Sequence, residues 1–285
     1  MNRRHPLALP PHLRALDRTL IMGVVNVTPD SFSDGGRHFD AHAGVAHGLA
    51  LVAQGADIVD VGGESTRPGA PRVAQDEELR RVLPVVEELA QQGVVVSVDT
   101  TRASVAQAAV QAGAVMINDV SGGLADSDMA GVAAETGAVY VAMHWRGHAQ
   151  VMDDHDRYVD VVSDVSMELL TRVENLRDAG VSPDNIVVDP GLGFSKTGAN
   201  NWPLLRHVAQ LNELGYPLLI GASRKRFLGR LLAGPDGQPV PPSARDDATA
   251  AVTALVAAHG AWCVRVHDVA KSVAAARVGD AWAAS

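Results

Sequence analysis

The chain has 285 residues, 47% of them hydrophobic, which is enough to bury a large core. Its 33 acidic and 24 basic residues give a net charge of −9, which disfavours binding to nucleic acid or to an anionic membrane. Residues 1–20 lack the apolar centre of a signal peptide, and no apolar run reaches the roughly 18 residues of a membrane-spanning helix. The single cysteine, Cys263, excludes an intramolecular disulfide framework. We therefore expect a cytoplasmic protein that binds neither nucleic acid nor membrane.

Short apolar runs rich in β-forming residues recur eight times, at 20–26, 57–61, 94–98, 114–118, 138–143, 186–189, 217–221 and 262–266. Segments with helical spacing alternate with them, at 41–54, 76–91, 103–112, 157–179, 200–213, 245–259 and 269–283. Glycines that suit a left-handed residue after a helix precede most strands, at Gly55, Gly93, Gly113, Gly137, Gly180, Gly215 and Gly260. This alternation predicts parallel strands joined by helices. We expect a single (β/α)8 TIM barrel over residues 20–285, preceded by an N-terminal extension over 1–19; a doubly wound sheet is the alternative.

Polar residues stand at the ends of these predicted strands. Acids and amides come early in the chain, at Asp99, Asn118, Asp119 and Asp189, and bases come late, at 224–226, Arg265 and His267. The carboxyl ends of the strands of a parallel barrel form its active site. We therefore expect these side chains to meet in one pocket.

The late bases predict an anion site, because barrels often bind phosphate at the loops after strands seven and eight. Ser223 offers a hydroxyl donor, Arg265 can hold two oxygens at once, and Lys225 carries a mobile positive charge. The alternative is that these are only surface bases at the beginnings of helices.

The early acids and amide predict a site for a flat nitrogen heterocycle. Asp99, Asn118 and Asp189 end three different strands, and such groups match the N–H and amino donors of a heterocycle with high selectivity. Each aspartate taken alone has another interpretation, as the N-cap of the helix that follows it.

Seven ordered segments of the chain resemble the dihydropteroate synthase family. They are MGVVNVTPDSFSDGG at 22–36, DVGGESTRPGA at 60–70, SVDTTRA at 97–103, INDVSGG at 117–123, DPGLGFSKT at 189–197, GASRKRFLG at 221–229 and RVHDV at 265–269. The resemblance implies a pterin-binding TIM barrel, usually a homodimer, and a target of sulfonamides. It also implies an enzyme of folate biosynthesis that joins 4-aminobenzoate to a dihydropterin methyl diphosphate and releases pyrophosphate with the help of Mg²⁺.

By position, the resemblance implies a role for each matched residue. The pterin would be held by Asp99, Asn118, Met143, Asp189 and Lys225, and the diphosphate by Asn26, Arg265 and His267, with Asn26 also holding Mg²⁺. The aminobenzoate would be held by Thr66, Arg67, Pro68, Phe194, Ser223 and Lys225, with a loop that bears Phe32 and Asp34. The catalytic residues would be Asp34, Asp99, Asp189 and Lys225.

Two irregular loops, at 27–40 and 62–73, contain glycines and prolines and are expected to close over the barrel mouth, although ordinary surface turns are the alternative. The segment 144–158 carries three histidines and three aspartates but lacks the spacing of a known metal motif. Two other functions share parts of this pattern: a pterin-binding methyltransferase that serves a corrinoid, and a non-catalytic paralogue that binds pterin. The segments ESTRPG, SRKR and RVHD disfavour the methyltransferase.

Overall fold

Eight parallel strands form one sheet that closes on itself in the computed structural model, which describes residues 4–28, 37–64, 72–147 and 156–284. Their spatial order is β6-β5-β4-β3-β2-β1-β8-β7. Val188 and Leu218 form a parallel bridge between the two outermost members, and Val188 N donates to Pro217 O at 2.9 Å. The predicted barrel is confirmed, because an open doubly wound sheet would leave these two edges apart. The strands are β1 Leu20–Asn26, β2 Ile58–Gly62, β3 Val96–Asp99, β4 Met116–Asp119, β5 Val139–Met143, β6 Ile186–Asp189, β7 Leu219–Ile220 and β8 Cys263–Val266.

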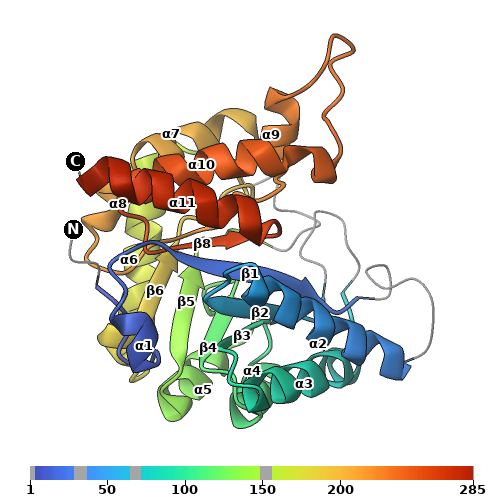
Figure 1. Ribbon diagram of the computed structural model, residues 1–285. Coiled ribbons are helices and arrows are strands. Elements are labelled where there is room, and N and C mark those ends of the chain that lie inside the picture. The colour runs from blue at the N-terminus through green and yellow to red at the C-terminus, as the bar shows by residue number, and fades with distance from the viewer. Residues whose placement is uncertain (1–3, 29–36, 65–71, 148–155, 285) are drawn as a thin grey trace.

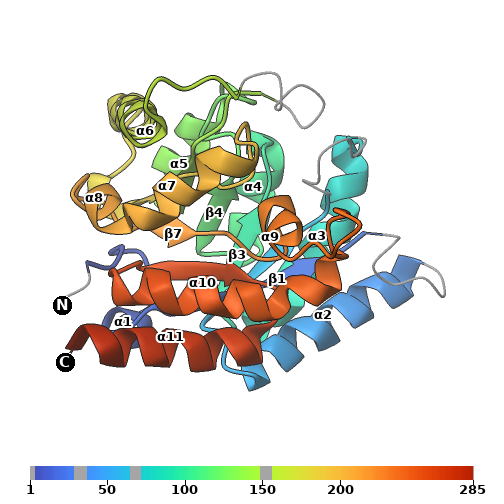
Figure 2. The same cartoon turned by 90° about the horizontal axis from the view of Figure 1, so that it is seen from above.

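Helices surround the barrel, as Figures 1 and 2 show. None of those in the described part of the chain is long and apolar enough to cross a membrane. All seven predicted glycines have positive φ, as a chain leaving a helix requires. The predicted helices are present, except that 200–213 forms two short helices, and α1, α5 and α9 were not predicted. The helices are α1 Pro11–Arg14, α2 Arg37–Ala53, α3 Gln75–Gln91, α4 Ala103–Gln111, α5 Met129–Thr136, α6 Val161–Asp178, α7 Asn201–Arg206, α8 Val208–Asn212, α9 Arg226–Leu231, α10 Asp246–Ala258 and α11 Val269–Ala284.

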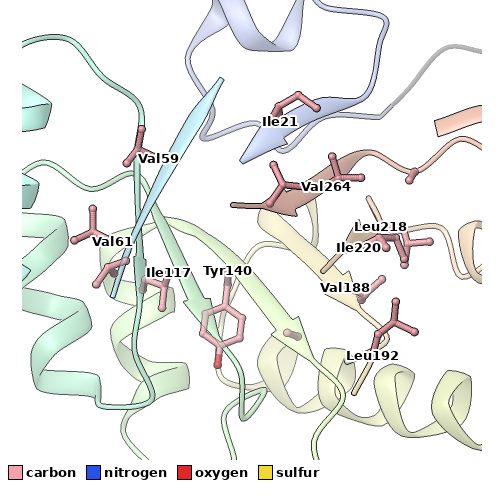
Figure 3. Packing of buried hydrophobic residues seen from close by; sticks show 14 of the residues in the cluster. Ile21, Val59, Val61, Ile117, Tyr140, Val188, Leu192, Leu218, Ile220 and Val264 are labelled. Atoms are coloured by element: carbon pink, nitrogen blue, oxygen red, sulfur yellow. The ribbon is translucent and has the colours of Figure 1, made fainter. Parts of the chain in front are cut away.

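The strands send alternate side chains to the barrel interior and to the helices. One buried cluster faces outward and packs under the helices; it includes Ile21, Val59, Ile117, Tyr140 and Val264 (Figure 3). A second cluster fills the lower barrel interior with Leu20, Met22, Ile58, Met116, Val141, Val187, Leu219 and Cys263. Interior positions nearer the carboxyl ends of the strands are polar, and they form the site described below.

The N-terminal segment before β1 closes the amino-terminal end of the barrel. Leu9 and Leu13, of which only 2% and 3% is exposed, belong to the interior cluster. Trp262 Nε1 donates to His5 Nδ1 at 3.1 Å, which ties the segment to the start of β8. Residues 4–16 thus cover the apolar interior at one end, and the opposite end is left for the site.

Candidate active site

The site consists of interior positions at the carboxyl ends of the strands. Parallel pairing places Asn26, Gly62, Asp99 and Asn118 at one level on β1 to β4. Gly62 leaves room for its neighbour, since a Cβ there would lie 3.3 Å from Asp99 Cβ. Alternate residues of each strand face the interior, so these residues, which are far apart in the sequence, form one polar layer of the barrel.

Arg265 on β8 joins the acids of β2 and β3. Its Nε donates to Asp60 Oδ2 at 2.6 Å, and its Nη2 donates to Asp99 Oδ2 at 2.6 Å. Asn118 Nδ2 also donates to Asp60 Oδ2, at 3.0 Å. The separation of acids from bases along the sequence is therefore not kept in space, because Arg265 reaches across to the early strands.

Asp60 is a site residue that the sequence analysis did not single out. Its side chain is fully buried, and its Oδ1 has no hydrogen-bond partner among the described residues. The sequence does carry a signal for Asp60. Residues two apart on a strand point to the same face, and Asp60 lies two residues before Gly62, so both face the interior. An acid in the middle of an apolar strand indicates a buried charge with a partner.

Burial changes the protonation of the carboxylates. It raises the pKa of Asp99 to about 7, against the attraction of Arg265, and it also raises the pKa of Asp189 on β6. Asp189 Oδ1 accepts a hydrogen bond from Gly191 N at 2.7 Å. Such shifted acids in one pocket are typical of functional sites.

Lys225, the residue just before α9, reaches the neighbouring turn that follows β6. Its Nζ donates to Leu192 O and lies 4.5 Å from the centre of the Phe194 ring. Gly193 allows this path, since a Cβ there would lie 3.0 Å from Lys225 Cδ. Burial lowers the pKa of the Lys225 ammonium to about 8, although Asp189 opposes the shift. The structure thus brings Asp189, Phe194 and Lys225 together, as predicted for the pterin and aminobenzoate sites.

Ser223 and His267, predicted for two different subsites, are hydrogen-bond partners. Ser223 Oγ lies 2.9 Å from His267 Nδ1, and His267 N donates to Ser223 Oγ at 3.1 Å. Met143, 3% exposed, ends β5 beside Asp189 of β6. Asn26 ends β1 and is partly exposed. The remaining predicted residues, Phe32, Asp34, Thr66, Arg67 and Pro68, lie outside the described residues, as do most of the two expected lids.

Asp119, also at the end of a strand, does not belong to the pocket. Its position on β4 faces outward, where Tyr140 Oη donates to Oδ2 at 2.6 Å and Ser121 Oγ donates to Oδ1 at 2.7 Å. Gly123 N also donates to Oδ2, at 2.8 Å. Asp119 therefore fixes the turn after β4 rather than a ligand.

Oxygen and nitrogen ligands for a metal are few among the described residues. No group of three histidine, cysteine or acidic side chains there has the arrangement of a metal site. His144, the first histidine of the segment 144–158, instead contacts Lys196 and Glu168. Asn26, with an amide oxygen at the barrel mouth, suits a hard cation that takes most of its ligands from a diphosphate and water.

The fold and this polar layer define a barrel enzyme whose buried carboxylates lie beside the bases Lys225, Arg265 and His267. Residues 22–267 match the family described as pterin binding enzyme. The dihydropteroate synthase of Mycobacterium leprae is 57% identical over 263 residues, which cover 92% of this chain and 93% of that protein. The chain therefore belongs to the dihydropteroate synthase family of pterin binding enzymes.

Solved structures agree with this assignment. The Xanthomonas albilineans dihydropteroate synthase with 4-aminobenzoic acid superposes with a TM-score of 0.86 at 46% identity, covering 94% of each chain. The same enzyme in complex with 7,8-dihydropteroate gives a TM-score of 0.83 at 43% identity, covering 94% of this chain and 95% of that chain.

Proposed function

We propose that this chain condenses 4-aminobenzoate with (7,8-dihydropterin-6-yl)methyl diphosphate to give 7,8-dihydropteroate and pyrophosphate. The observation that carries the proposal is the buried layer of Asp99, Asn118 and Asp189 beside Lys225, in a chain 57% identical to a dihydropteroate synthase. Relatives of known structure bind 4-aminobenzoic acid and 7,8-dihydropteroate. The non-catalytic alternative gains no support from these relatives, and the methyltransferase is not among the names they carry.

The pterin ring is assigned to the carboxylate layer. Asp99 and Asp189 accept hydrogen bonds from ring N–H and amino groups, and Asn118 and Lys225 donate to ring nitrogen or oxygen atoms. The side chains of both acids are 5% exposed, so an analogue that fails to match them leaves a buried group unpaired. Met143 covers the apolar side of the ring.

The diphosphate is assigned to Asn26, Arg265 and His267, with Mg²⁺ held at Asn26. The ion supplies charge neutralisation for the leaving group when it is bound. Arg265, fixed by two acids, presents its remaining N–H groups to phosphate oxygens, and His267 is oriented by its hydrogen bond to Ser223. Such preorganised donors stabilise charge that develops on a departing diphosphate.

The reaction then proceeds by cleavage of the bond between the pterin methylene and the diphosphate oxygen, with the electron pair leaving on the diphosphate. The methylene and pterin carry the positive charge, which Asp99 and Asp189 stabilise. The amino group of 4-aminobenzoate forms the new C–N bond, and the resulting ammonium gives one proton to water. Lys225, Phe194 and Ser223 hold the aminobenzoate, together with Thr66, Arg67 and Pro68, and Asp34 acts with the closing loop.

Assembly as a homodimer is part of the proposal. Helices α10 and α11 pack side by side on the outside of the barrel (Figures 1 and 2). They expose Leu255, Val278 and Trp282, at 63%, 65% and 78% of their surfaces. Large apolar side chains in such positions are typical of contact surfaces between proteins.

The test of the proposed activity is product formation. Purified protein is given both substrates and Mg²⁺, and 7,8-dihydropteroate is measured by mass spectrometry. We expect product from the wild type and a large loss of product formation with Lys225→Met, whose side chain has a similar length without the charge. An Arg18→Met variant at the opposite end of the barrel is the control and should retain activity. A wild type that binds the pterin substrate and forms no product would instead favour the non-catalytic paralogue.

A further inference from the structure

The segment after β5, rich in histidine and aspartate, has no role in the proposed reaction. Its described residues contact the turn that follows β6. Tyr158 Oη donates to Ser195 O at 2.9 Å, and Asp156 Oδ2 accepts from Thr197 N at 2.9 Å. Asp156 Oδ1 accepts from Asn200 Nδ2 at 2.7 Å. The described residues of this segment therefore support the β6 turn.

Lys196 is the buried centre of this support. It is 3% exposed, and its Nζ lies 2.9 Å from His144 Nδ1, 3.1 Å from Gly191 O and 3.0 Å from Phe194 O. An ammonium has three hydrogens, and this arrangement uses all of them. None of the three acceptors is a carboxylate, so the charge is not there to form an ion pair. Burial lowers the pKa of Lys196, and the nearby carboxylates of Asp189 and Glu168 oppose the shift.

The contact with His144 fixes the protonation of that ring. Nδ1 accepts from Lys196, so Nε2 carries the hydrogen, and Nε2 lies 3.1 Å from Glu168 Oε2. Burial lowers the pKa of His144 to about 4, which keeps the ring neutral at neutral pH. Arg146 Nε in turn donates to Glu168 Oε1 at 3.1 Å, and its guanidinium lies 4.0 Å from the centre of the Tyr158 ring.

The turn held by Lys196 is conformationally demanding. Gly191, Gly193 and Ser195 all have positive φ, of 66°, 74° and 49°. Gly191 also lies so close to β5 that a Cβ would meet His144 O at 2.3 Å. Alternating left-handed residues are not favoured by local preference, so surrounding contacts must hold them. Lys196 supplies contacts at both ends of this stretch, on Gly191 O and Phe194 O.

We propose that Lys196 is a positioning residue for the aminobenzoate side of the pocket, an inference that rests on the proposed function. It holds the carbonyl of Phe194, whose ring faces Lys225, and the turn whose Leu192 O accepts from Lys225. The pterin side depends on it less. The backbone of Asp189 precedes the turn and is fixed by pairing with Met143 of β5, although its Oδ1 also accepts from Gly191 N. Asp99 and Asn118 lie on β3 and β4, away from the turn.

The test is Lys196→Met, which keeps the length of the side chain and removes its donors. We expect the KM for 4-aminobenzoate to rise about tenfold, a change of about 1.4 kcal/mol, while the KM for the dihydropterin diphosphate stays within about twofold. The matched control is Tyr158→Phe, which removes one hydrogen bond to the same turn and leaves the three contacts of Lys196 intact. Both KM values should stay near wild type in the control.

If Lys196→Met does not fold, a second variant tests the same inference. His144→Phe removes the ring acceptor of Lys196, together with the contact to Glu168. We expect a rise in the same KM of about threefold, with the pterin KM unchanged. Equal rises of both KM values, or a loss of melting temperature with both KM values unchanged, would show that Lys196 is merely structural. A wild type without turnover would overturn the proposed function and this inference with it, whereas an active wild type with an unaltered KM in Lys196→Met overturns this inference alone.

Discussion

Replacing Arg265 by lysine tests the central contact of the pocket. Arg265 makes two hydrogen bonds of 2.6 Å, from two different nitrogens to two different carboxylates. Lysine keeps the charge but has a single nitrogen, so it cannot reproduce this fixed fork. One charge-assisted hydrogen bond is lost, which corresponds to about 1.5–3 kcal/mol in the free energy of unfolding.

The same change should affect the reaction. The guanidinium that is held by Asp60 and Asp99 is also the proposed donor to the diphosphate, so its loss should lower kcat/KM by about ten- to a hundredfold. Stability is measured by urea unfolding, and activity by the rate of pyrophosphate release. Because lysine cannot bridge two acids and a phosphate, both effects should appear in the one variant.

Arg18→Lys is the matched control at the other end of the barrel. Arg18 Nη1 and Nη2 donate to the two oxygens of Asp57 at 2.8 and 2.7 Å, but its side chain is 37% exposed. Solvent screening reduces the cost there to about 1 kcal/mol or less. Its kcat/KM should equal that of the wild type. An Arg265→Lys variant with wild-type stability and activity, or an equal loss of activity in the control, would show that the fixed fork of Arg265 is not needed in the pocket.

Three further predictions concern charge and packing. The kcat/KM should rise with pH as Asp99, with a pKa of about 7, becomes ionised, and it should fall again as Lys225, with a pKa of about 8, loses its proton. A flat profile of kcat/KM between about pH 6 and 9 would contradict this assignment. Asp119→Asn turns an amide hydrogen toward the donors of Tyr140 or Ser121. The free energy of unfolding, measured by thermal unfolding, should fall by about 2–5 kcal/mol with little change in KM. An undiminished melting temperature would argue against a structural role for Asp119. Leu13→Ala, which opens a cavity below the barrel interior, should cost about 2–5 kcal/mol in urea unfolding and leave kcat/KM unchanged, and an unaltered midpoint would show that the segment does not pack there.

The sequence predicts the barrel well because its signals are local. Alternating β and helical segments, with a glycine before most strands, follow from backbone preferences that each segment carries by itself. The bounds of β1 and β6 agree with the prediction. The predicted helix at 200–213 is interrupted at His207, and α5 and α9, of 8 and 6 residues, are too short to show a clear helical period.

The site is predictable in part, for the same reason. Position at the end of a strand indicates which residues approach the pocket, and the structure places Asp99, Asn118 and Asp189 there. Strand parity separates them from Asp119, which ends β4 but faces outward. The long reach of Arg265 to Asp60, and that of Lys196 to His144, depend on side chains brought together from distant segments, and no local pattern contains that information.

The proposed reaction is tested most directly by pyrophosphate release from the purified wild-type protein given dihydropterin methyl diphosphate and Mg²⁺, with and without 4-aminobenzoate. We expect release that increases with 4-aminobenzoate, matches the 7,8-dihydropteroate formed, and is lost in Lys225→Ala. Tight binding of the pterin diphosphate with no release on adding 4-aminobenzoate would contradict it.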